Sequence, residues 1–238
     1  MNTTLYKASS RGHFDHGWLD TYHTFSFANY YDPYRVQFGA LRVINDDVVT
    51  GGMGFDTHPH NNMEIISIPL LGDLEHKDSM GNTSTIREGD VQVMSAGTGV
   101  LHSEYNPNSD RIVNFFQIWV FPDKRDVEPR YQQMSLDYLN RKNELVQIVS
   151  PNADSKGLWI HQQAWFSIGT FDKSSFVDYM VKRKGNGVFA MVIEGNFTIG
   201  AHKLHRRDGL SIADTDVVKI TSDSDDSRIL LIDVPLDI

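Results

Sequence analysis

Two short segments of the chain carry histidines and a carboxylate at spacings that suit metal binding. His58 and His60 lie in "THPHNNMEII", and His102 and Glu104 lie in "TGVLHSEYN". Residues i and i+2 of a β-strand project from the same face, so each pair aims its side chains in one direction. Glu64 shares the parity of His58 and His60 if the strand is not bulged. If the two strands are neighbours, four nitrogen and oxygen ligands meet at one point, namely His58, His60, His102 and Glu104.

The types of ligand limit the choice of metal. The chain has no cysteine, which excludes disulfides, thiolate zinc sites and iron-sulfur clusters. Imidazole and carboxylate ligands suit Fe(II), manganese, nickel, cobalt, zinc and copper, and affinity order does not choose among them. Four protein ligands leave coordination positions open, as a catalytic site requires. We expect one divalent metal ion in the N-terminal domain, Fe(II), with the other five metals as alternatives.

A surface pair of histidines is the alternative to a metal site. A single H-x-H motif in a β-rich chain is weak evidence for metal binding. The H-x-E motif at His102 and Glu104 adds a second pair, and apolar runs follow or enclose both. Polar groups buried there without a ligand would cost a few kcal/mol each. This cost favours metal binding.

Composition and charge exclude several classes of function. The chain has 22 basic and 31 acidic residues and a formal net charge of -9, so we expect no direct nucleic-acid binding. The first 20 residues lack the apolar stretch of a signal peptide, and no run approaches the roughly 20 apolar residues of a membrane span. We therefore expect a cytoplasmic protein that does not bind membranes.

The elements around the motifs are short strands. From Phe38 to Phe121 β-rich runs alternate with turn signals such as "NDD", "GD" and "GTG". This spacing indicates an antiparallel sandwich or barrel. Residues 122–134 are charged and proline-containing, and we interpret them as a connection between domains. The predicted domains are residues 1–125, with the metal site, and residues 126–238.

The second half of the chain repeats the pattern of the first. "IPLLGDLEH" aligns with "MVIEGNFTI", which matches Gly72 to Gly195, and a second alignment matches Gly89 to Gly209. The chain therefore reads as two copies of one antiparallel β-barrel. Counted from these glycines, the four ligand positions fall in the second copy on Val181, Arg183, Ser222 and Ser224. We predict that the C-terminal domain lacks metal ligands.

Two other groups of histidines stand near these strands. His13, His16 and His23 lie among aromatic residues in segment 11–33. We interpret this segment as packing across a sheet or a domain interface, with the lining of a pocket as the alternative. His76 and Asp78 end a strand in a turn and could reach the mouth of the barrel, although hairpin chemistry explains most of that segment.

Several segments together resemble one known family. "GHFDHGWLDTYHTFSFANYYDP", "GFDTHPHNNMEI", "EHKDSMGN" and "MSAGTGVLHSEYNP" are similar to the pirin family of the cupin superfamily, in particular to bacterial members described as quercetin 2,3-dioxygenases. The resemblance covers nearly the whole chain. It implies an all-β bicupin fold, in which two antiparallel β-barrel (jelly-roll or cupin) domains pack together.

The resemblance also implies roles for individual residues. The first cupin motif maps onto Gly52, His58, His60, Glu64 and Gly72, and the second onto Gly89, Gly97, His102 and Asn106. In pirins the fourth ligand is the glutamate two residues after the second-motif histidine, which is Glu104 here. Glu64 is then expected behind the ligands or as a substitute for Glu104. Asn61 and Asn62 stand where relatives often have charged residues or glycine, and we expect them to border the pocket entrance.

The function implied is that of a metal-dependent dioxygenase, which cleaves quercetin or a related flavonol with O2 and releases carbon monoxide. Glu104 would serve as the catalytic base, and Phe55, Met80 and Tyr105 as the apolar wall of the pocket. The first alternative is a metal-dependent regulatory protein, a transcription co-regulator or modulator of a metabolic enzyme, which binds a protein partner without turnover. The second is a structural bicupin with a vestigial metal. We expect a monomer in each case.

Overall fold

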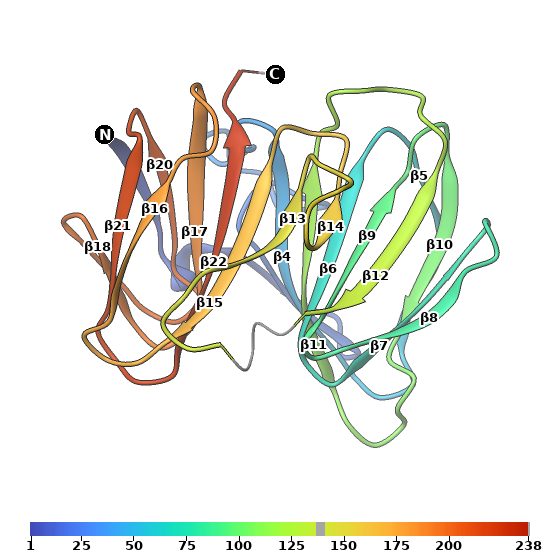
Figure 1. Ribbon diagram of the computed structural model, residues 1–238. Helices are drawn as coiled ribbons and strands as arrows, with labels where there is room; N and C mark the ends of the chain where they lie inside the picture. Colours follow the sequence, from blue (N-terminus) through green and yellow to red (C-terminus); the bar gives the residue numbers. More distant parts are fainter. Residues whose placement is uncertain (137–140, 238) are drawn as a thin grey trace.

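The computed structural model describes residues 1–136 and 141–237 and is built almost entirely of β-strands (Figure 1). Two units lie side by side, each made of a seven-stranded and a four-stranded sheet. The all-β, two-domain jelly-roll fold is confirmed, although the two sheets of each domain stay separate and do not close into a barrel. A single 3-10 turn, η1 (Ala8–Ser10), is the helical element of the described residues, and no helix there could cross a membrane.

The N-terminal domain holds both predicted ligand pairs. Its seven-stranded sheet runs, in spatial order, through β12 (Arg130–Ser135), β9 (Asp90–Ser95), β6 (Glu64–Leu71), β11 (Val113–Val120), β4 (Leu41–Val49), β3 (Leu19–His23) and β2 (Gly12–Asp15). Its four-stranded sheet runs through β5 (Gly54–His60), β10 (Val100–Tyr105), β7 (Asp73–Asp78) and β8 (Thr83–Arg87).

The C-terminal domain repeats this arrangement. Its seven-stranded sheet runs through β1 (Asn2–Tyr6), β20 (Gly209–Ala213), β17 (Asn186–Glu194), β22 (Ser227–Pro235), β15 (Trp165–Phe171), β13 (Val146–Ser150) and β14 (Leu158–Trp159). Its four-stranded sheet runs through β16 (Phe176–Met180), β21 (Val217–Ser222), β18 (Phe197–Ile199) and β19 (His202–Leu204).

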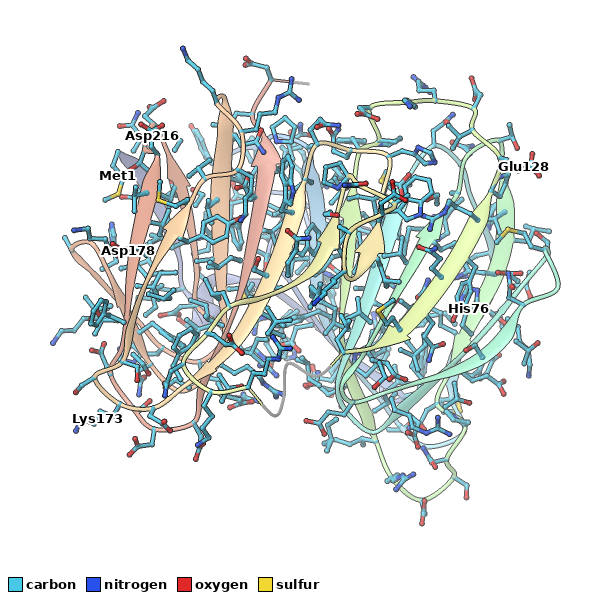
Figure 2. The ribbon with its side chains drawn as sticks, viewed as in Figure 1. Met1, His76, Glu128, Lys173, Asp178 and Asp216 are labelled. Atoms are coloured by element: carbon cyan, nitrogen blue, oxygen red, sulfur yellow. The ribbon has the colours of Figure 1, made fainter. Side chains whose placement is uncertain are left out.

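Two strands cross between the halves of the chain. The first strand, β1, pairs with β20 in the C-terminal sheet, and Figure 2 shows Met1 on the same side of the molecule as Asp178 and Asp216. Conversely, β12 pairs with β9 in the N-terminal sheet. Residues 130–135, which we interpreted as part of a connection, are therefore a sheet strand. The division at residues 125 and 126 stays a prediction. Strands β1 and β12 each belong to the sheet on the other side of this division.

A hydrophobic core between the two seven-stranded sheets joins the domains. It contains Ile66 and Phe116 from the N-terminal sheet and Phe166 and Phe189 from the C-terminal sheet, all fully buried. Each such side chain contributes about 1.5–3 kcal/mol on burial. Because the N-terminal sheet is covered on both faces, alternate residues of its strands face either the other domain or the interior of their own.

Strand β4 illustrates this alternation. Asp46 points toward the other domain, where Arg207 Nε donates to Asp46 Oδ2 at 2.9 Å in a buried ion pair. Its neighbours Asn45 and Asp47 face the interior of the N-terminal domain. We predicted a turn at "NDD", but these residues lie within a continuous strand because each of the three finds a buried polar partner.

Candidate metal centre

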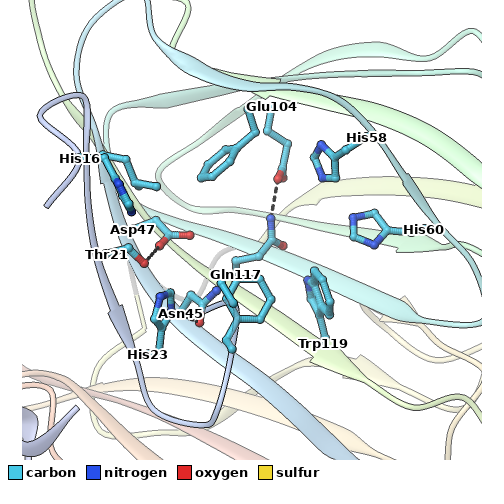
Figure 3. A pocket seen from close by; sticks show the side chains of 14 residues that line it. His16, Thr21, His23, Asn45, Asp47, His58, His60, Glu104, Gln117 and Trp119 are labelled. Carbon is cyan, nitrogen blue, oxygen red and sulfur yellow. Dashed lines mark hydrogen bonds between the residues drawn. The ribbon is translucent and has the colours of Figure 1, made fainter. Parts of the chain in front are cut away.

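Three histidines converge between two neighbouring strands of the N-terminal domain, and Figure 3 shows two of them, His58 and His60. Strands β5 and β10 pair antiparallel, which meets the condition set for the two motifs to come together, and His58 lies opposite His102. The ring centroid of His102 lies 4.4 Å from the ring centroid of His58 and 4.9 Å from that of His60. One potential ligand atom from each of His58, His60 and His102 lies within 4.8 Å of the other two. In the described chain these three form a cluster that could hold a metal ion.

Close contact between the strands depends on a glycine at the start of β5. A Cβ atom on Gly54 would come within 2.3 Å of the backbone oxygen of Glu104 and 2.5 Å of Tyr105 Cα. The pairing register also shifts between His102 and Glu104, as at a β-bulge. The H-x-H and H-x-E strands can therefore approach each other only because residue 54 has no side chain.

The three imidazoles have the properties that metal ligands need. His58 Nδ1 donates to the Asp56 carbonyl at 2.7 Å, which leaves Nε2 free to bind a metal. Both ring nitrogens of buried His102 lack a hydrogen-bond partner among the described residues, a cost that a bound ion would relieve. Burial and the neighbouring histidines lower the pKa of His60 to about 4 and that of His102 to about 3, so both rings are neutral. The residues fit a divalent ion.

Glu104 lies beside the cluster but has other partners. Its side chain is buried, Ser67 Oγ donates to Oε1 at 3.1 Å, and Gln117 Nε2 donates to Oε2 at 2.5 Å. The carboxylate does not belong to the group of ligand atoms within 4.8 Å of one another. It lines the same cavity as His58 and His60. Its role as fourth ligand stays a prediction.

His76 lies behind the cluster rather than at the barrel mouth. Its ring is fully buried, 5.4 Å from that of His102, and is stacked on Tyr131 at 4.6 Å. His76 Nε2 lies 3.0 Å from Asp78 Oδ2. Figure 2 shows His76 in the N-terminal domain, on the right of the view. The buried pair of His76 and Asp78 therefore packs against the ring of His102 without a hydrogen bond to it.

A cavity of about 220 Å³ opens next to the histidines (Figure 3). Its walls come from both sheets of the N-terminal domain and from segment 11–33. The lining residues are His16, Leu19, Thr21, His23, Phe27, Ala28, Asn45, Asp47, Phe55, His58, His60, Glu104, Gln117 and Trp119. Our preferred interpretation of segment 11–33 as packing alone was wrong, because His16 and His23 line the cavity.

Sequence reasoning missed two cavity residues that a pattern could have revealed. Gln117 and Trp119 occupy inward positions of β11, whereas Ile118 lies in the core between the domains. Gln117, the one amide in the apolar run "FFQIWV" (115–120), marked the face that turns toward the site. Trp119 packs edge-on against His60, with ring centroids 4.8 Å apart.

Of the predicted wall residues, only Phe55 lines the cavity. Met80 lies on the surface with 37% of its area exposed. Tyr105 donates from its hydroxyl to Asp56, away from the cavity. Asn61 and Asn62 line a separate surface hollow near Arg125, and Asn62 Nδ2 donates to Asp126 Oδ1 at 3.0 Å. None of these four residues therefore lines the cavity.

Glu64 points away from the histidines. Strand β5 ends at His60, Asn62 has a φ of 47°, and β6 begins at Glu64, so the side-chain alternation restarts there. The inward position of β6 near Glu104 is taken by Ser67. Ser95 Oγ donates to Glu64 Oε2 at 2.7 Å on the opposite face. We had placed Glu64 on the same face as His58 and His60 by counting every second residue, but this count does not hold across the break between β5 and β6.

The environment of Glu64 predicts a pH-dependent stability difference. Burial raises its pKa from 4.5 to about 7, although the hydrogen bond from Ser95 and the charge of Arg130 oppose the shift. In the unfolded chain the carboxyl group of Glu64 loses its proton from about pH 4.5, whereas in the folded protein it keeps the proton up to about pH 7. Wild type should therefore lose stability relative to Glu64→Gln by about 2–3 kcal/mol between pH 5 and pH 8. Denaturant unfolding of both metal-free proteins tests this, and parallel pH profiles would refute it.

The corresponding positions of the C-terminal domain are apolar. Strand pairing makes Tyr179 and Val218 the counterparts of His58 and His102. By the same pairing, Val181 and Ile220 correspond to His60 and Glu104. All four pack in or against that domain's own hydrophobic core. Counting from glycines misplaced these positions, because the two copies differ in the length of their turns.

Comparison with known proteins identifies the family. Residues 5–120 match the family model described as Pirin, and residues 147–234 match the Quercetinase C-terminal cupin domain. A protein named quercetin 2,3-dioxygenase from Escherichia coli K12 is 46% identical over 97% of this chain and 98% of its own length. A putative quercetin 2,3-dioxygenase of Pseudomonas aeruginosa is 39% identical over 94% of this chain and 95% of its own.

Solved structures agree with this assignment. The crystal structure of the bacterial pirin YhhW from Escherichia coli in complex with nickel(II) superposes with a TM-score of 0.93 and 43% identity. The match covers 98% of this chain and 99% of that one. The match at this identity and coverage, together with the three-histidine cluster, makes this a metal-binding cupin. The chain belongs to the pirin family.

Proposed function

We propose that the protein is a metal-dependent dioxygenase that cleaves quercetin or a related flavonol with O2 and releases carbon monoxide. The observation that carries this proposal is the convergence of His58, His60 and His102 at one end of a partly apolar cavity. The Escherichia coli relative named quercetin 2,3-dioxygenase supports the choice of substrate.

We assign His58, His60 and His102 as ligands of one divalent ion, with Glu104 as the fourth. Fe(II) is the metal we propose, with nickel, manganese, cobalt, zinc and copper as alternatives, since imidazole and carboxylate accept all of them. The nickel(II) complex of the related YhhW supports a divalent first-row metal. When bound, the ion supplies Lewis acidity, which lowers the pKa of a coordinated substrate hydroxyl and holds the substrate near O2.

The residues of the chain hold the substrate and move its proton. Glu104 is the base that takes the proton of the flavonol hydroxyl, since its carboxylate accepts hydrogen bonds from Ser67 and Gln117 and faces the cavity. Phe27, Phe55 and Trp119 form apolar walls that exclude water and hold aromatic rings. Two carbon–carbon bonds of the central ring then break: each of the two outer carbons gains one atom of O2, and the carbon between them, which carried the hydroxyl, leaves as carbon monoxide.

The size of the cavity limits how much of a flavonol it encloses. Its volume of about 220 Å³ is below the roughly 300–1,000 Å³ of sites that bury a drug-sized ligand. One ring system is held inside, next to the metal, and the remaining ring lies at the mouth. Loop residue Ala28, with a φ of 47°, forms part of this mouth.

Oxygen-dependent carbon monoxide release from quercetin tests the proposal. We expect release from iron-reconstituted wild type and at least about a 100-fold lower rate from metal-stripped protein and from His58→Ala. Restoring the metal should restore the rate of wild type alone. No release from wild type that holds one equivalent of metal would refute the proposal and favour a metal-dependent regulatory protein.

A further inference from the structure

One wall of the cavity is a row of polar side chains on the seven-stranded sheet. The inward positions of β3 present Thr21 and His23, and those of β4 present Asn45 and Asp47. His58 and His60 enter the same cavity from β5 of the four-stranded sheet (Figure 3). A molecule bound at the histidines therefore has this polar row on its other side.

Most polar groups of the row already have partners. His23 Nδ1 lies 2.8 Å from Asn45 Oδ1, and Thr21 Oγ1 donates to Asp47 Oδ1 at 2.5 Å. The hydrogen bond from Thr21 uses Oδ1, and the second oxygen, Asp47 Oδ2, has no hydrogen bond to any side chain or backbone group that the structure describes. Asp47 is only 4% exposed, and its carboxyl group is directed into the cavity (Figure 3).

An unpartnered carboxyl oxygen in such surroundings costs free energy. Burial raises the pKa of Asp47 to about 7, the hydrogen bond from Thr21 opposes this shift, and the charges of Asp46 and Glu104 increase it. Among the described residues, none of the charges that shift the pKa of Asp47 is positive. A ligand hydroxyl that reaches Oδ2 would supply the missing hydrogen bond.

We propose that Asp47 is a substrate-binding residue whose Oδ2 forms a hydrogen bond with a second ring hydroxyl of the flavonol, distinct from the hydroxyl at the metal. The substrate class is then a polyhydroxylated aromatic rather than any compound with a single enol. This inference rests on the proposed function. His23 and Asn45 bond to each other through Nδ1 and Oδ1, and Asp47 is the carboxyl group of the row, so we take Asp47 as the acceptor for the second hydroxyl.

Binding without turnover tests this role. Nickel(II)-loaded protein is titrated with quercetin and with 3-hydroxyflavone in the absence of O2, and quenching of tryptophan fluorescence gives each Kd. 3-Hydroxyflavone keeps the enol and the carbonyl that face the metal but lacks every other hydroxyl. The ratio of the Kd for 3-hydroxyflavone to the Kd for quercetin measures the preference for quercetin. This ratio should be about tenfold lower in Asp47→Ala than in wild type, because one hydrogen bond to quercetin is lost. Asp47→Asn keeps a polar group and should retain part of the preference.

Asp20→Asn is the matched control. Asp20 lies on β3 but turns outward to His13, at 2.7 Å, and should leave both Kd values unchanged. Equal weakening of both flavonols in Asp47→Ala and Asp47→Asn would overturn the role of Asp47 and leave the proposed function intact. Failure of wild type to bind either flavonol would overturn both proposals.

Discussion

His102→Ala should abolish metal binding. His102 is the most enclosed of the three histidines, with 2% of its surface exposed, and its ring lies within 5 Å of both other histidine rings of the cluster. Losing a group that only orients a ligand costs about 10–100-fold in metal affinity, so losing a ligand should cost at least about 100-fold. Metal content after dialysis against a chelator, together with calorimetric titration of nickel(II), measures the effect.

A neighbouring residue separates this effect from damage to the strand. Ser103 follows His102 on β10 and faces the opposite side, so Ser103→Ala should retain full metal content. Metal-free His102→Ala should unfold at a denaturant concentration close to that of metal-free wild type, since two unpartnered buried nitrogens are removed with the ring. Unchanged nickel affinity in the alanine variant would show that the ion binds elsewhere.

Glu104→Gln should lower the rate of carbon monoxide release by about 100- to 10,000-fold, the usual contribution of a positioned base. Glutamine keeps the volume of the side chain and can still accept a hydrogen bond from Ser67, but it cannot take a proton from the substrate. Three histidines remain for the metal, so we expect the variant to bind it. The measurement is kcat with quercetin at saturating concentration, alongside metal content.

The same substitution at Glu64 is the control. Glu64 is equally buried but faces away from the cavity, so Glu64→Gln should leave kcat unchanged. If Glu104→Gln loses metal as well as activity, its main role is that of a ligand. If it loses neither, the proton goes to another group.

The site could be predicted where a local rule governed it. Residues two apart on a strand share a face, and this rule alone predicted the pairs at His58 and His102. That the pairs meet depends on β5 and β10 being neighbours, which the repeated strand pattern and the family resemblance favoured. The all-β fold was predictable for the same reason, because alternating apolar runs separated by turns are typical of jelly rolls.

The remaining features depend on contacts between segments far apart in the sequence. "NDD" looked like a turn because the buried partners of its residues are distant, as with Asp46 and Arg207. Segment 11–33 enters the cavity because β3 pairs with β4, which no local pattern reveals. Glu64 was misassigned because a single residue at positive φ, Asn62, separates two strands that the sequence presents as one run.

The pairing of β1 with β20 has a consequence for biosynthesis. Asn2 lies opposite Ala213, so β1 cannot pair with its partner until the ribosome has also made β20. Until then its edge is unpaired and open to other chains. The C-terminal sheet is therefore expected to gain β1 only after β20 has been made, and not while the N-terminal half is being synthesised. A truncated chain of residues 1–125 would lack β12 and leave β1 without its partner, which predicts aggregation instead of an isolated metal-binding domain.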